Sequence, residues 1–182
     1  GDSQIFPLFN NATNEKYNIT AKLQHITPNA YWYFEQNSSV NLENLKETAK
    51  TFEEKILPTI ITTFGNIWPL DATGNLRITI LHAPLSGSIG YYTSINEHPV
   101  EVHESSIERK AIYLHSQDLK LGSDSYFSIL SHELQHMSHW NQDPTEDSWV
   151  NEGLSELAAD VTGFPNNQAG RFALDPSTQL NA

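Results

Sequence analysis

The sequence predicts an α+β fold, in which a mixed β-sheet is backed by one long helix and followed by a small helical C-terminal lobe. Short segments with alternating or continuous apolar residues recur up to residue 115 and are typical of strands. An apolar repeat of helical period runs from Leu42 to Phe64 and predicts the backing helix. Two more helical segments follow residue 122, on either side of a polar connection.

A length of 182 residues fits one domain with a core of its own. Within it we distinguish a lobe of sheet and backing helix, residues 1–122, from a helical lobe, residues 123–182. The abrupt end soon after Asp175-Pro176 is typical of a fragment of a longer protein.

The first two predicted strands form a hairpin. Apolar side chains alternate between Tyr17 and Thr27, which indicates a strand with one buried face. Pro28-Asn29 interrupts this pattern, and the aromatic run Tyr31–Phe34 suits a second strand.

The backing helix has recognisable ends. Asn41 is a suitable N-cap, and Gly65 is expected to end the helix. Pro58 lacks an N–H group and should kink or interrupt the helix near its middle.

The remaining strands are expected at Leu76–Leu81, Gly87–Tyr92 and Ala111–His115. A turn at Asp71–Asn75 precedes the first of them, and residues 96–109 read as a polar surface loop.

The helical lobe begins at the turn and N-cap Gly122-Ser123-Asp124. The polar stretch Asn141–Asp147 separates this helix from a second one, expected between Ser148 and Thr162 and closed by Gly163. A further short helix is expected around Gln168–Leu174.

Composition narrows the function classes. The formal net charge of −12 disfavours binding to nucleic acid, a polyanion that the protein's field would repel. No apolar stretch is long enough to span a membrane. Because the chain has no cysteine, a metal site must use His, Asp or Glu. The composition predicts no oligomeric state.

The strongest motif is His132-Glu133-Leu134-Gln135-His136. Residues four apart on a helix lie on nearly the same face, so His132 and His136 can offer ring nitrogens to one ion. Glu133 can then lie beside the open coordination position, which is the arrangement of a zinc hydrolase. The alternative is two solvated histidines on a helix surface. The preceding strand, the N-cap and the helical flanks favour the Zn²⁺ site.

The third ligand is a choice between two carboxylates. Glu152 lies sixteen positions after His136, and Glu156 lies one turn further on the same helix face. We expect one of them to bind the metal and the other to accept a hydrogen bond from a ligand histidine. The spacing alone leaves both assignments open.

Together with Trp149-x-Asn151-Glu152-Gly153, the motif resembles the gluzincin clan of zinc metallopeptidases, most closely the bacterial secreted enzymes of the hyicolysin type. The resemblance is strongest over Ser125–Gly163. It implies a zincin-like domain, Glu152 as third ligand and Glu156 as the support of His132. The gap between His136 and Glu152 is shorter than in thermolysin-like members, so Glu156 is the reserve ligand.

The resemblance implies a secreted, bacterial-type endopeptidase that hydrolyses peptide bonds in proteins with Glu133 as general base. An aminopeptidase of the same clan and an inactive member that binds only metal or protein are the alternatives. Gly87–Thr93 is the candidate edge for a peptide substrate. The pattern does not choose an oxyanion donor among Tyr91, Tyr92, His98, His103 and Tyr113.

Overall fold

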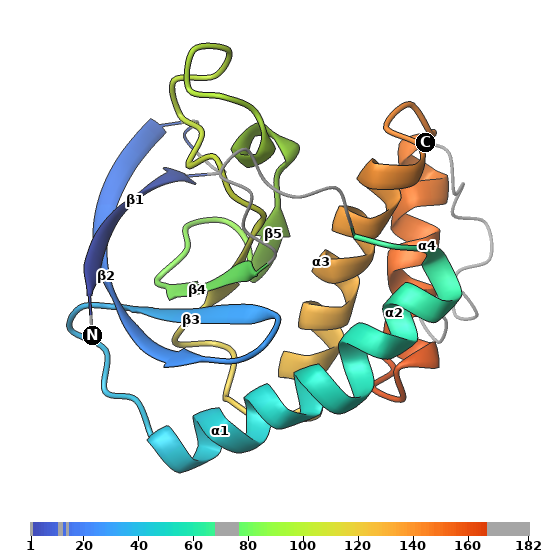
Figure 1. The fold of residues 1–182 in the computed structure, drawn as a ribbon, viewed down its shortest axis with the longest axis horizontal. Coiled ribbons are helices and arrows are strands. Elements are labelled where there is room, and N and C mark those ends of the chain that lie inside the picture. The colour runs from blue at the N-terminus through green and yellow to red at the C-terminus, as the bar shows by residue number, and fades with distance from the viewer. Residues whose placement is uncertain (1, 11–12, 14, 68–76, 167–182) are drawn as a thin grey trace.

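The computed structural model describes residues 2–10, 13, 15–67 and 77–166. Over these residues the chain has an α+β fold, as predicted, with a curled mixed sheet and helices on one side of it (Figure 1). The expected turn at Asp71–Asn75 and the expected helix at Gln168–Leu174 lie outside the described residues.

Among the described residues the sheet has six strands in the order β1-β2-β3-β4-β6-β5. Neighbouring strands are antiparallel from β1 to β3, parallel from β3 through β4 to β6, and antiparallel between β6 and β5. Their bounds are β1 Ser3–Asn10, β2 Glu15–Ile26, β3 Ala30–Glu35, β4 Ile78–Ala83, β5 Gly90–Tyr92 and β6 Ala111–His115.

Most strand predictions are confirmed, with two corrections. Strand β1, which contains Pro7, was not predicted; proline is tolerated there because β1 lies at the edge of the sheet. The strand expected over Gly87–Tyr92 is shorter, because Gly87 adopts a positive φ of 81° and β5 begins only at Gly90.

The backing helix is confirmed at both ends. The Asn41 side chain accepts hydrogen bonds from two main-chain N–H groups of the first turn, and Gly65 ends the helix with a φ of 104°. The helix consists of α1 (Leu42–Thr51), a π-helical turn (Phe52–Ile56) and α2 (Leu57–Phe64). The wider π turn ends at Ile56, two residues before Pro58. Proline has no main-chain N–H group, so Pro58 cannot donate the hydrogen bond that a normal helix requires there.

Successive side chains along each strand point to opposite faces of the sheet. Each face carries its own buried core. On β4, Ile80 faces the helices whereas Leu81 faces the side over which the sheet curls. The helix side is filled by Trp32, Leu45, Phe52, Ile60, Ile112, Tyr126, Leu130 and Leu134. The other side is filled by Phe6, Leu8, Ala21, Tyr33, Leu81 and Tyr113.

The last two helices bring the histidine motif beside the sheet. Helix α3 (Asp124–Gln142) starts at the predicted cap Ser123, and its buried residues Phe127, Leu130 and Leu134 join the helix-side core. Helix α4 (Ser148–Val161) packs along α3, and β5 contacts α3 from the sheet. None of the helices in the described part of the chain is long and apolar enough to cross a membrane.

Candidate metal centre

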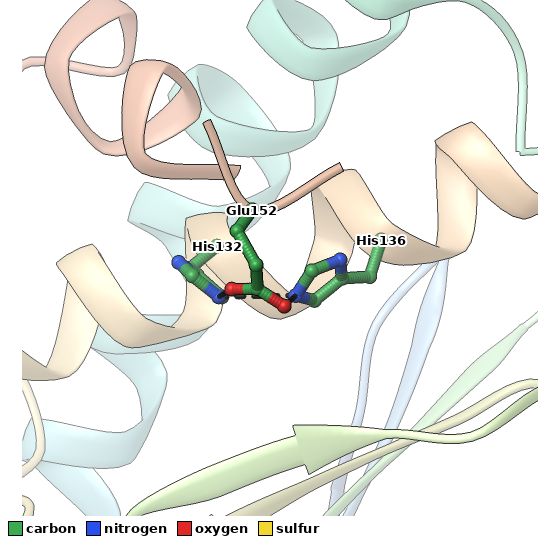
Figure 2. A group of neighbouring side chains, drawn as sticks. All are labelled: His132, His136 and Glu152. Carbon is green, nitrogen blue, oxygen red and sulfur yellow. Dashed lines mark hydrogen bonds and ion pairs between the residues drawn. The ribbon is translucent and has the colours of Figure 1, made fainter. Parts of the chain in front are cut away.

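Helices α3 and α4 bring together His132, His136 and Glu152 (Figure 2). Within the described residues, one ligand atom from each lies within 4.8 Å of the others. The two histidines come from consecutive turns of α3, and Glu152 reaches them from α4. The sequence therefore predicted three residues that do meet in space.

The spacing of the three side chains suits a small cation. The two Nε2 atoms of His132 and His136 lie 3.0 Å apart. Glu152 lies 3.5 Å from His132 Nε2 through one oxygen and 3.6 Å from His136 Nε2 through the other. Ligands of a tetrahedral zinc ion are about 3.3 Å apart, because each lies about 2.0–2.1 Å from the metal. The donor set and its spacing therefore fit Zn²⁺.

The two carboxylates of α4 face different sides of His132. Glu152 approaches Nε2, the atom that also faces His136. Glu156 lies 3.3 Å from Nδ1, on the opposite side of the ring. That contact, through Glu156 Oε1, is within ion-pair distance but forms no hydrogen bond, and His132 Nδ1 is buried without a hydrogen-bond partner. The other carboxylate oxygen, Oε2, is also buried without one. Glu156 therefore lies where it could support His132, and only Glu152 joins the ligand group.

His136 is held from behind by Asn151. Its Nδ1 lies 3.0 Å from the Asn151 side-chain oxygen. With a proton on Nδ1, the ring donates to this oxygen and leaves Nε2 free to bind an ion. This role of Asn151 was not predicted from the sequence, where the residue is only part of the motif that carries the resemblance. Its position directly before Glu152 was the available signal.

Glu133 is a residue of α3, and its side chain reaches β5 and is only 6% exposed. Burial raises its pKa to about 7, against the opposing effects of His132 and of a hydrogen bond from the Tyr92 main-chain N–H. A carboxyl group with a pKa in this range can both accept and return a proton near neutral pH.

The charges around the ligand group favour a cation. Burial lowers the pKa of His132, but three nearby glutamates outweigh it and the net shift is upward. Contact with His132 lowers the pKa of Glu152. Burial, together with the neighbouring His132, lowers the pKa of His136 despite its bond to Asn151. The upward shift of the His132 pKa reflects its three carboxylate neighbours, whereas burial dominates at His136.

An open cleft of about 350 Å³ adjoins the metal centre. It extends from His136 and Glu152 past the C-terminal end of α3, where Trp140, Asp143 and Glu146 contribute to its walls. Thr93 and Ser94, directly after β5, line it as well. No lysine or arginine lies among its lining residues in the described part of the chain.

The structure separates the candidate oxyanion donors. Tyr91 and Tyr113 stack at 4.5 Å on the face of the sheet away from α3. Tyr92 lines the cleft, but its hydroxyl group donates to Glu97 at 2.7 Å. His139 also lines the cleft.

Comparison of the sequence with models of known protein families finds no match, and comparison with curated proteins finds no significant match.

Proposed function

We propose that this chain is a zinc-dependent peptidase with a zincin-like fold. The observation that carries the proposal is the convergence of His132, His136 and Glu152 with the buried Glu133 beside them. Three protein ligands leave one position of a four-coordinate ion open, as in catalytic zinc sites. The resemblance of the motif to gluzincins supports the same reading. Secretion, also implied by that resemblance, stays a prediction.

The chain's own groups account for the proton transfers. Zinc in this site would supply Lewis acidity toward water and toward a substrate carbonyl group. Glu133 is placed to take a proton from the attacking water as general base. Its carboxyl group then returns that proton to the nitrogen of the leaving amine. A pKa of about 7 suits a group that acts in both directions.

Strand β5 is the proposed binding edge for a peptide substrate. It lies at one edge of the sheet and leads directly into Thr93 and Ser94, which line the cleft. An extended peptide could pair with this edge through main-chain hydrogen bonds. The Tyr92 N–H group, bonded to Glu133, links the same strand to the proposed base.

The substitution Glu133→Gln tests the proposal. It removes the base and keeps the shape of the side chain, so hydrolysis of a denatured protein such as casein should fall by at least about 10²-fold. The zinc content of the variant, measured by mass spectrometry of the metal, should stay near one ion per chain.

Glu54→Gln is a matched control, because Glu54 is exposed on the backing helix and the chemical change is the same. It should hydrolyse casein at the wild-type rate. A wild-type chain that binds zinc and leaves casein intact would instead support the inactive alternative. Cleavage of a peptide with a blocked N-terminus separates an endopeptidase from an aminopeptidase.

A further inference from the structure

A buried polar contact joins α3 to α4 directly behind the metal centre. The Ser155 hydroxyl group donates a short hydrogen bond to the side-chain oxygen of Gln135. Both side chains are buried, at 0% and 1% exposure. The same Ser155 oxygen lies 3.0 Å from Nδ1 of His136. This contact therefore reaches a proposed ligand from the side opposite the ion.

The direction of these hydrogen bonds is determined by chemistry. A serine hydroxyl group has one hydrogen to donate, and its oxygen can accept another bond. The acceptors that compete for that hydrogen are the Gln135 side-chain oxygen and the Asn151 main-chain oxygen at 3.0 Å, and neither can donate. If the hydrogen pointed at His136 instead, the buried Gln135 oxygen would lose its partner, which costs about 1–3 kcal/mol.

The Gln135 amide is oriented to accept from Ser155. Its nitrogen lies 3.4 Å from Nδ1 of His139, and its oxygen faces the Ser155 hydroxyl group. Asn151 alone does not determine which ring nitrogen of His136 carries the proton. If the Asn151 side-chain amide were rotated, it would present an N–H donor to Nδ1 in place of its oxygen. The serine and glutamine, oriented in this way, disfavour that alternative.

We propose that Gln135 and Ser155 are positioning residues that select the His136 tautomer with its proton on Nδ1. In this tautomer Nε2 carries a free lone pair directed at His132 and Glu152. The inference rests on the proposed metal site and is independent of peptidase activity. Outer contacts of this kind are typically worth 10- to 100-fold in metal affinity.

A second polar contact between the same helices is a matched comparison. Thr162 donates to Ser131 at 2.9 Å, and both side chains are fully buried. Unlike Ser155, this pair has no contact with a histidine among its hydrogen bonds to described residues. Thr162→Val therefore removes a buried hydroxyl group from the α3–α4 interface without touching the metal centre.

The experiment compares Ser155→Ala, Gln135→Met and Thr162→Val with the wild-type protein. Zinc affinity is measured by competition with a coloured chelator. The His136 tautomer is read from the ¹⁵N shifts of its ring in the metal-free protein at pH 8. We expect about 10- to 100-fold weaker zinc binding and a larger share of the Nε2–H tautomer in the first two variants. Thr162→Val should change zinc affinity by less than about twofold.

The proposal is overturned if Ser155→Ala and Gln135→Met bind zinc like the wild type and keep the proton of His136 on Nδ1. It is also overturned if Thr162→Val weakens zinc binding as much, because the effect would then be general loosening of the helix pair. Since the substitutions lie on different helices, one folded variant is enough for the test. Should the wild-type protein bind no zinc, the proposed function fails, while the metal-free tautomer still decides this inference.

Discussion

His82 shows how the surroundings of a histidine decide its chemistry. Its Nδ1 lies 3.0 Å from the Tyr33 main-chain oxygen, and its Nε2 lies 2.8 Å from the Tyr126 hydroxyl group. The ring also stacks on Phe34 at 3.9 Å. With both nitrogens occupied and no carboxylate among these partners, burial lowers its pKa to about 4. His132, surrounded by glutamates, shifts the other way.

We expect His82 to make the protein less stable in acid. The unfolded chain protonates this histidine below about pH 6.5, whereas the folded protein resists protonation down to about pH 4. The contribution of neutral His82 to the free energy of unfolding is therefore complete above pH 6.5 and is lost as the pH falls toward 4. At pH 4.5 the loss should be about 2–3 kcal/mol. Urea unfolding at pH 7.5 and 4.5 measures the loss. His82→Asn should lose less stability over this interval by about that amount, and an equal loss in both proteins would contradict the assignment.

The close approach of β5 to α3 depends on Gly90. A Cβ atom at this position would lie 2.7 Å from a methyl group of Ile129 and 3.2 Å from the Tyr113 main-chain oxygen. Isoleucine on a helix has little rotamer freedom to yield, and a main-chain oxygen in the sheet has less. The absence of a side chain thus lets the strand that carries Tyr92 reach Glu133.

Gly90→Ala should destabilise the protein by about 1–3 kcal/mol through overpacking, as measured by urea unfolding. It should also slow hydrolysis while zinc content is retained, because α3 and α4 alone carry the proposed ligands. Gly153 on α4 is the comparison, since an added Cβ meets no atom within 4 Å. Gly153→Ala should stabilise the protein by about 0.5–1 kcal/mol, because alanine favours a helix. The two substitutions should therefore change the free energy of unfolding in opposite directions. Destabilisation by both would contradict the role assigned to Gly90.

The overall charge adds to the local charge of the cleft. The formal net charge is −12, and the cleft walls include Asp143, Glu146 and Glu152 but no lysine or arginine in the described part of the chain. The C-terminal end of α3, where the cleft lies, also carries partial negative charge. The long-range field and the near groups thus favour cationic peptides.

If the chain is a peptidase, as proposed, it should cleave a lysine-rich peptide with a higher kcat/KM than a neutral peptide of the same length at low salt. The advantage should shrink between about 20 and 200 mM salt, because ions screen exposed charges. The double variant Asp143→Asn/Glu146→Gln should reduce the advantage by about two- to tenfold. Glu47→Gln/Glu54→Gln removes the same charge on the backing helix and should have the smaller effect. Equal effects of both double variants would assign the preference to net charge alone.

Local patterns were enough to place most elements and two of the proposed ligands. The caps Asn41 and Ser123 and the apolar repeat of the backing helix were all readable, because each acts over a few neighbouring residues. His132 and His136 are likewise four positions apart, so a single helix brings them together. Strand β1 was not predicted, because its proline is compatible with a strand only at a sheet edge.

Contacts between distant segments required the folded chain. The choice between Glu152 and Glu156 depends on how α4 lies against α3, because the two carboxylates lie one turn apart on the same helix face and the sequence does not separate them. The bond between Ser155 and Gln135, and the one between Tyr92 and Glu133, likewise join elements far apart along the chain. Periodicity reports which side of a helix or strand is buried, whereas the packing of all elements together determines which side chains meet there.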